Sequence, residues 1–172
     1  VSFGENWYSK IYAGHSLNAN RVQFPISTNN LFWDWLVDCG KQGKIKIPES
    51  VFDEIGEGND GLAQWIKQNK EHFFIPKDDA YTHMPAVMDA YVKAYGQDSS
   101  FPEGTLETLK ADPYVVAHAK GLSASVATGE LAKNGKLANY KEVKIPHVCQ
   151  LLNIPCFTFI QFLWAIRADL PE

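Results

Sequence analysis

The sequence predicts an α/β fold in which a mostly parallel sheet is covered by helices. Short strand-like runs alternate with helical patterns along the chain, and this alternation is typical of a parallel sheet with helices on its faces. The chain has 172 residues, of which 45% are hydrophobic, enough for one core and too few for two. No internal repeat or low-complexity tract divides it. We therefore expect a single domain spanning residues 1–172.

The first half of the chain contains two well-marked helices. Asn30–Gly40 is a helix that Thr28 or Asn29 can cap, and it carries a cluster of aromatic residues. Pro48 opens a second helix, which runs to Gly56, because a proline at a helix start loses no hydrogen bond. The other elements expected here are a strand at Val1–Phe3, a helix at Asn6–Ala13, an alternating strand at Lys44–Ile47, a helix at Gly61–Lys70 and a strand or packed turn at Phe73–Ile75.

The second half continues the same alternation. Met84–Tyr95 places its apolar residues at helical spacing, and a polar loop containing proline and glycine follows it at Gln97–Gly104. The remaining expected elements are a helix at Leu109–Gly121, a buried strand at Ser123–Ala127, a short strand at Val143–Ile145, a helix at His147–Leu152, a strand at Cys156–Phe159 and a helix at Ile160–Ala168.

Charge and composition exclude several classes of protein. A net charge of −4 argues against a protein that binds nucleic acid over its whole surface, although it leaves room for a local basic strip. The three cysteines form no CxxC pair and the five histidines are scattered, so we expect neither a disulfide framework nor a zinc site. No apolar run reaches the roughly 18 residues of a membrane span. No secretory signal is visible at Val1, so we expect a cytoplasmic protein with no membrane contact.

Two acidic residues stand where open α/β folds place their sites. Asp112 precedes Pro113, a pair that strongly favours a helix start with the Asp as N-cap. Glu130 follows the strand Ser123–Ala127, at the sheet edge where ligands bind in such folds. Asp112 alone is explained equally well as a simple cap. Together the two carboxylates can converge on one metal ion.

A third acidic residue, Glu54, lies beside the core-facing side of its helix. At 100° per residue it projects about 60° from Val51 and about 100° from Ile55, whereas Asp53 points away from the core. A carboxylate beside a buried face needs a partner, since burying it alone costs several kcal/mol. The partner is either a cation in a functional site or a nearby lysine.

These segments resemble the PIN domain family. The spacing from Asp112 to the triplet Thr128-Gly129-Glu130 is similar to the second half of a PIN domain, where a helix led by Asp precedes a strand ending in Thr-x-Asp or Thr-x-Glu. The helix that supplies a Glu in this family resembles the segment from Ile47 to Ile55, in which that residue is Glu54. Three further segments look like a bacterial PIN-like subfamily similar to VapC-type toxins: Phe32–Leu36, Asn59–Trp65 and Lys144–Cys149.

The resemblance implies a three-layer α/β/α PIN-like fold and a metal-dependent endoribonuclease. The metal would be Mg²⁺ or Mn²⁺, which prefer oxygen ligands. The implied ligands are the carboxylates of Glu54, Asp112 and Glu130. Thr128 would hydrogen-bond a carboxylate or the RNA phosphate, although it is equally well explained as a strand-end hydroxyl.

The start of the chain departs from the family pattern. The first PIN strand ends in an Asp, usually followed by Ser or Thr and then Asn. In this sequence Asn6 fits the last place and would orient the site, so Gly4 stands where the first Asp is expected. This chain is therefore expected to lack one ligand and to be weakly active or inactive, with Gly4→Asp restoring cleavage; a shifted register, with Glu5 as the ligand, is the other explanation.

The resemblance also implies partners. RNA would be the substrate, a small antitoxin protein would neutralise the enzyme, and a homodimer is a further expectation. Trp33, Trp35 and Trp65 form either an apolar groove for the antitoxin or part of the core. The lysines that could contact RNA phosphates, or simply lie in solvent, are Lys41, Lys44, Lys46, Lys133, Lys136, Lys141 and Lys144.

Two other functions remain open. A PIN-like fold that has lost catalysis could bind RNA or a protein partner, and Gly4 favours this possibility while the three retained acids oppose it. A doubly wound receiver domain is the other, but it needs an acidic pair at the end of the first strand. The run Phe3-Gly4-Glu5 supplies only one acid.

Overall fold

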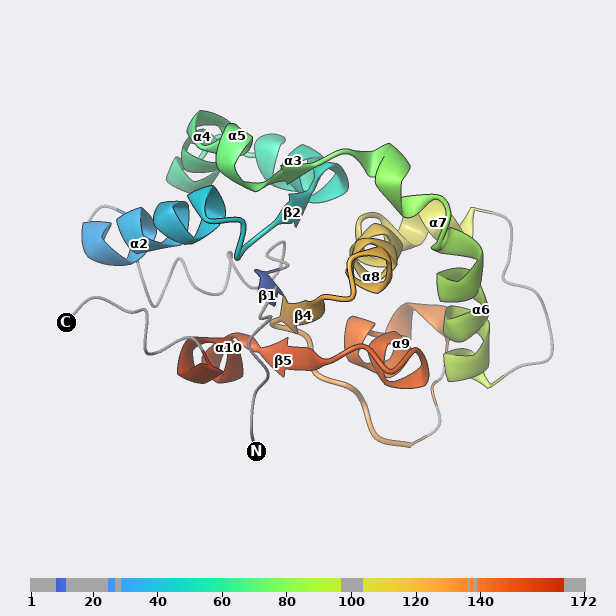
Figure 1. Ribbon diagram of the computed structural model, residues 1–172. Helices are drawn as coiled ribbons and strands as arrows, with labels where there is room; N and C mark the ends of the chain where they lie inside the picture. The colour runs from blue at the N-terminus through green and yellow to red at the C-terminus, as the bar shows by residue number, and fades with distance from the viewer. Residues whose placement is uncertain are drawn as a thin grey trace.

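The computed structural model describes residues 9–11, 25–26, 29–96, 104–135, 137 and 139–165, and these form a mixed α/β structure (Figure 1). The strands are β1 (Ser9–Ile11), β2 (Ile47–Pro48), β3 (Phe74–Ile75), β4 (Ser125–Thr128) and β5 (Cys156–Thr158). The helices are α2 (Asn30–Lys41), α3 (Glu49–Gly56), α4 (Gly61–Gln68), α5 (Lys70–Phe73), α6 (Met84–Tyr95), α7 (Thr105–Leu109), α8 (Asp112–Gly121), α9 (Ile145–Leu151) and α10 (Phe159–Ala165), with 3-10 turns η1 (Lys77–Ala80) and η2 (Tyr140–Glu142).

The strands form two small parallel sheets. β4 lies between β1 and β5, with Ile11 opposite Ala127 and Thr128 opposite Thr158. β2 pairs with β3 separately. The expected α/β class with parallel pairing is therefore confirmed at this level. Every pairing in the described part of the chain is parallel, so the carboxyl ends of β1, β4 and β5 meet at one edge.

Helix α8 lies at the centre of the molecule (Figure 1). It contacts α6, α9, β4, β2 and η1, and all its residues from Pro113 to Ala119 are buried. A helix that is apolar all round can be stable only when other elements cover every side of it. Its first residue, Asp112, is therefore carried into the interior by the helix that follows it.

The aromatic residues of the first half form the core beneath α2. Trp33 and Trp65 meet edge to face with ring centroids 4.7 Å apart, and both are buried, as is Trp35. Of the two explanations for these three tryptophans, the core is therefore confirmed and the apolar groove is excluded, because their side chains are buried. Gly40 allows α2 to approach Phe73 of α5, since a Cβ at Gly40 would come within 2.5 Å of the Phe73 ring.

Most expected helices are confirmed. α2 is capped by Asn29, whose side chain accepts a hydrogen bond from the Phe32 amide, and α6 has the expected bounds. Two predictions are wrong. Ser9–Ile11 is a strand although a helix was expected at Asn6–Ala13, and Ile145 begins α9 although a strand was expected at Val143–Ile145. The strand expected at Val1–Phe3 lies outside the described residues.

The two wrong predictions have physical causes. Three residues of β1 carry too little pattern to outweigh the helical spacing of the aromatic residues around them. At Val143–Ile145 the alternation is real, but Pro146 follows directly and favours the first turn of a helix.

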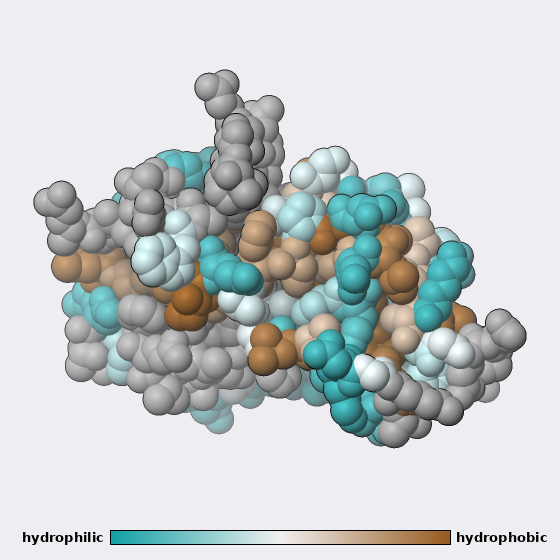
Figure 2. All heavy atoms as spheres, turned by 90° about the horizontal axis from the view of Figure 1, so that it is seen from below, coloured by the Kyte–Doolittle hydropathy of each residue, from teal (hydrophilic) through white to brown (hydrophobic). Residues whose placement is uncertain are grey.

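No helix among the described residues combines the length and hydropathy needed to cross a bilayer. Large hydrophobic side chains that remain exposed include Leu151, Ile160 and Trp164. Figure 2 shows the molecule from below, where apolar residues lie between hydrophilic ones among the coloured atoms.

Candidate active site

Glu130 is held by three separate contacts. The hydroxyl of Thr128, at the end of β4, accepts a hydrogen bond from the Glu130 amide at 3.1 Å and fixes the turn between them. One carboxylate oxygen accepts from the Ile145 amide at 3.0 Å, at the start of α9. The other lies 3.1 Å from the Lys144 ammonium, and only 9% of the Glu130 side chain is exposed. Charge-assisted bonds of this kind are about twice as strong as neutral ones, so Glu130 is firmly oriented.

Within the described part of the chain, Glu54 is held by one hydrogen bond. Its carboxylate accepts a hydrogen bond from the Ala111 amide at 3.2 Å, directly before α8. Glu54 is half-buried and Asp53 is exposed, as the helical geometry predicts. Within the described part of the chain Glu54 makes no ion pair with a lysine, so the alternative explanation of a Lys partner is not supported.

Asp112 occupies the first turn of α8 and does not cap it. The N-cap position belongs to Ala111, Pro113 takes the second helical position, and the helix start has no side-chain cap bond. The prediction that Asp112 is the N-cap is therefore wrong by one residue. As a result, no bond to its own helix start engages the carboxylate.

Glu54 and Glu130 both act on Asp112. Burial, followed by the negative charges of Glu130 and Glu54, raises the pKa of Asp112 from 3.8 to about 7, and the ammonium of Lys144 partly offsets this rise. An effect of this kind requires the carboxylates to be near each other in a region of low polarity. The three predicted acids, which lie far apart in the sequence, are thus gathered around the start of α8.

Tyr91 of α6 also belongs to this neighbourhood, although the sequence pattern assigns it only to the core. It is fully buried. Burial, and then the charges of Asp112 and Glu130, raise the pKa of its hydroxyl well above 10. Tyr91 therefore stays protonated beside the acids. Its apolar spacing on α6 gave no signal of this proximity.

Two thiols lie near one another, and the charge of Glu130 acts on one of them, Cys156. Cys149 of α9 is buried and Cys156 of β5 is partly exposed, and both are free. A hydrogen bond between the two side chains raises the pKa of Cys149 and lowers that of Cys156. The expectation of free thiols outside any disulfide is confirmed for these two.

The three acids offer the right chemistry for a hard divalent cation but do not form a closed cage. Among the described residues no group of three acidic, histidine or cysteine side chains is close enough to hold a metal directly. The Glu54 carboxylate instead accepts from the Ala111 amide, and the Glu130 carboxylate from the Ile145 amide. Mg²⁺ commonly keeps several waters and takes only one or two carboxylates. The donor set fits such a partly hydrated ion, since the acids outnumber the neighbouring cation Lys144.

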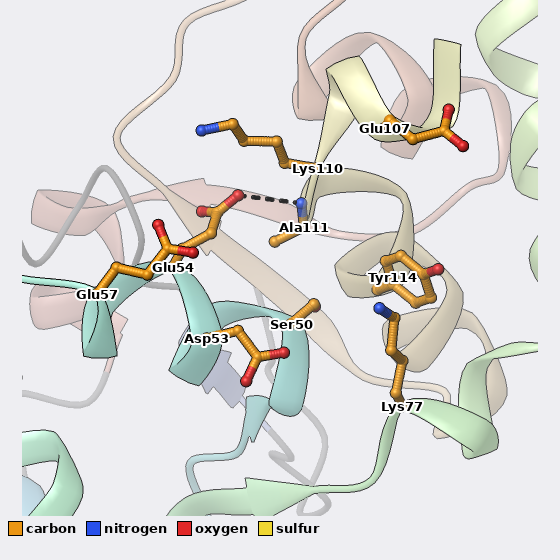
Figure 3. A pocket seen from close by; sticks show the side chains of 9 residues that line it. All are labelled: Ser50, Asp53, Glu54, Glu57, Lys77, Glu107, Lys110, Ala111 and Tyr114. Atoms are coloured by element: carbon orange, nitrogen blue, oxygen red, sulfur yellow. Dashed lines mark hydrogen bonds between the residues drawn. The ribbon is translucent and has the colours of Figure 1, made fainter. Parts of the chain in front are cut away.

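A pocket of about 450 Å³ opens beside Glu54 (Figure 3). Figure 3 shows Glu54 and Glu57 projecting from α3 on one side, with Lys77 and Tyr114 opposite them. The residues that line it are Ser50, Asp53, Glu54, Glu57, Lys77, Glu107, Lys110, Ala111 and Tyr114. This size falls within the range of small-molecule binding sites. The pocket gives solvent and ligands a path to Glu54.

Gly4 and Asn6 lie outside the described residues. The strand that pairs with β4 is Ser9–Ile11, so it begins after Gly4 and does not end before it. Gly4 therefore does not stand at the carboxyl end of the strand that pairs with β4, while the strand expected at Val1–Phe3 stays a prediction. After Ile11 the next acidic residue in the sequence is Asp34, in α2. With β1 as the first strand, the acid that the PIN pattern expects directly after it is missing.

Some of the candidate RNA-binding lysines have partners within the protein. Lys144 pairs with Glu130, and Lys133 pairs with Glu142 at 2.8 Å. Lys41 lies 3.5 Å from Asp38 on the same helix. Lys136 lies outside the described residues. Lys144 thus orients a carboxylate of the site, a role that its position in a run of lysines did not reveal.

Comparison with known proteins identifies the family. Residues 11–170 match the model of a family described as a domain of unknown function (DUF4411), and the chain belongs to this family. The comparison with curated proteins gave no match. Nor did the comparison with solved structures.

Proposed function

Since the description of this family assigns no activity, we propose from the site itself that the protein is a Mg²⁺- or Mn²⁺-dependent endoribonuclease of PIN type. The observation that carries the proposal is the electrostatic coupling of Asp112 to both Glu54 and Glu130. Three carboxylates brought together at such a cost to the charged form are typical of functional sites. The parallel pairing of β1, β4 and β5 is compatible with the three-layer α/β/α arrangement of PIN domains, which we include in the proposal.

Each acid has a distinct part in this proposal. A bound divalent ion would activate water and stabilise charge on the phosphate. Glu130, fixed by Lys144 and Ile145, is the rigid ligand. Asp112 would hold the ion only in its ionised form, and Glu54, which lines the pocket, would supply a further carboxylate.

The missing first acid shapes the expected activity. Without an acid directly after β1, the site has three carboxylates where the PIN pattern has four, so we expect weak metal binding. This same observation favours a second candidate function, a PIN-like module that binds RNA or protein without cleaving. We also propose, on the resemblance alone, that the chain is the toxin of a toxin–antitoxin pair with a small antitoxin as its partner.

Metal titration and RNA cleavage test the proposal together. Mn²⁺ binding is followed by electron paramagnetic resonance, and cleavage of total RNA is measured in Mn²⁺, in Mg²⁺ and in EDTA. We expect binding and metal-dependent cleavage in the natural chain, and their loss in Glu54→Gln. The matched control is Glu71→Gln, because the Glu71 side chain is 81% exposed and far from α8 in sequence.

The outcomes separate the candidates. Metal binding without cleavage on any RNA supports the non-catalytic module. If Mn²⁺ does not bind at millimolar concentration, or if Glu54→Gln binds and cleaves as the natural chain does, the nuclease proposal is wrong.

A further inference from the structure

The pocket beside Glu54 contains a buried hydroxyl without a partner. Ser50, in the first turn of α3, lines the pocket and is only 7% exposed. Its hydroxyl has no hydrogen-bond partner among the described residues. Buried polar groups almost always have partners, so each exception needs an explanation. The Ser50 oxygen is itself closed to solvent, so it can meet a ligand in the pocket only after the hydroxyl turns about its side-chain torsion.

The charges around Ser50 describe the ligand. Asp53, Glu54, Glu57 and Glu107 supply carboxylates, while Lys77 and Lys110 supply ammonium groups. Figure 3 shows Asp53 and Lys77 on either side of the space below Ser50. In the described part of the chain, no ion pair joins these two residues to each other or to others. Acceptors and donors therefore face the pocket together and are available to a ligand.

Local structure holds the two lysines in place. The Lys77 amide donates to the Glu49 carboxylate at 2.9 Å, and its ammonium lies 4.6 Å from the centre of the Tyr114 ring. Lys110 has a φ of 52°, a left-handed conformation that turns the chain between α7 and α8. A non-glycine residue in this conformation costs about 1–2 kcal/mol. The fold therefore accepts strain at the rim of this pocket.

Simple ions and cationic side chains match this lining poorly. A bare phosphate would meet four carboxylates against two lysines. A metal ion would face the two ammonium groups. An arginine side chain would satisfy the carboxylates, but it has no acceptor to offer Lys77 or Lys110. The ligand must carry paired donors and separate acceptors on one rigid group.

We propose that this pocket binds a guanine base of the RNA substrate, next to the point of cleavage. Guanine presents two adjacent donors, N1–H and the N2 amine, which match the two oxygens of the Asp53 carboxylate. Its O6 and N7 atoms are acceptors to which lysine side chains commonly donate. No other RNA base has two adjacent donors beside such acceptors. Ser50 supplies the remaining bond. The proposal rests on the proposed nuclease function, because that function makes RNA the ligand.

Binding without metal tests the base preference separately from cleavage. Fluorescein-labelled pentaribonucleotides with a single central guanine, hypoxanthine or adenine in an adenine background are titrated in EDTA and followed by anisotropy. Hypoxanthine differs from guanine only by the missing N2 amine. We expect guanine to bind about tenfold more tightly than hypoxanthine, as for one hydrogen bond to a charged group. Adenine is expected to bind more weakly still.

Variants locate the preference in the pocket. Asp53→Asn is expected to bring the ratio of guanine to hypoxanthine binding close to one, because the Asp53 carboxylate accepts from the N2 amine. Ser50→Ala removes a bond that both bases make, so it is expected to weaken both and to keep their ratio. The matched control is Asp34→Asn, since Asp34 is also an exposed carboxylate on a helix but lies in α2. This control is expected to keep the tenfold ratio.

Three results would overturn the assignment. The three oligonucleotides could bind equally, Asp53→Asn could keep the preference, or arginine methyl ester could bind in a manner that depends on Asp53 while guanine does not. The last result would assign the pocket to a protein partner. A guanine preference in EDTA together with no cleavage in Mn²⁺ would keep the pocket and remove the nuclease. Cleavage without any base preference would keep the nuclease proposal and remove the guanine pocket.

Discussion

The two arms that carry the acids of this site are built differently. On one arm, the Glu130 amide donates to the Thr128 hydroxyl at the end of β4, and the Glu130 carboxylate accepts from the Ile145 amide of α9 and pairs with Lys144. On the other arm, α3 holds Glu54 through one amide bond beside an open pocket. The negative charges of Glu130 and Glu54 both raise the pKa of Asp112. The difference between the arms shows that Glu130 is fixed by several contacts while Glu54 is held by one. Asp112, which lies near both, has the raised pKa.

The largest effect is expected from Asp112→Asn. This change removes the charge that both arms oppose, so metal-dependent cleavage should fall by at least on the order of 100-fold. The free energy of unfolding at pH 8 should rise by about 1–3 kcal/mol, because the buried charge is gone. Urea denaturation and cleavage assays on the same preparations measure both. A variant that loses stability as well as activity would show that Asp112 has an ordinary structural role.

The pH dependence is the next largest effect. The folded pKa of Asp112 is raised from 3.8 to about 7, so its ionisation destabilises the folded chain increasingly from about pH 4 to about pH 7 and by a constant amount above that. Metal binding needs the ionised form. Mn²⁺ affinity should therefore fall about tenfold per pH unit below 7, and binding at pH 6 should release about one proton.

Calorimetry in two buffers of different ionisation enthalpy measures that proton. The control is the stability of Asp112→Asn, whose difference from the natural chain should vanish near pH 4. An affinity that stays constant between pH 5 and pH 7 would contradict the coupling of the two arms at Asp112.

Removal of each outer acid sharpens the comparison directly. Glu130→Gln loses the ion pair with Lys144 and a charged acceptor at Ile145, but it also removes the charge that raises the Asp112 pKa more than Glu54 does. The free energy of unfolding is therefore expected to fall by about 1 kcal/mol. Glu54→Gln keeps an acceptor for one amide and relieves Asp112, so we expect a change within about 0.5 kcal/mol. Urea denaturation at pH 8 gives both values, and Lys144→Met with Glu130→Gln completes a double-mutant cycle. Equal losses in the two variants would show that the arms do not differ.

The sequence predicted the parts of this site that depend on local pattern. Asp112 follows from an Asp-Pro helix start, Glu130 from its place after a strand, and Glu54 from its angle beside the stripe of Val51 and Ile55. All three lie where these patterns put them, apart from the one-residue shift of the α8 cap. Helix positions also depend on local pattern, and the structure confirms the bounds that the apolar spacing predicted for α6.

Contacts between distant segments could not be read from the sequence. Lys144 lies among several lysines, and only the fold brings its ammonium to Glu130. Nor do the residue types of Ala111 and Ile145 indicate that their backbone amides donate to Glu54 and Glu130. The short strand β1 failed for a related reason: three residues are defined by pairing with β4 rather than by their own pattern.

The smallest effect is expected from Gly4→Asp. Neither arm of the site takes a ligand from the residues before β1. β1 pairs with β4, the strand that ends at Thr128. An acid at position 4 precedes this strand, whereas the carboxyl ends of parallel strands form the edge where Glu130 lies. Metal affinity and cleavage should therefore change by less than about twofold. Side-by-side assays of Gly4→Asp and the natural chain in Mn²⁺ measure this. A large gain in cleavage would place the first residues of the chain beside Asp112 and add a third arm to the site.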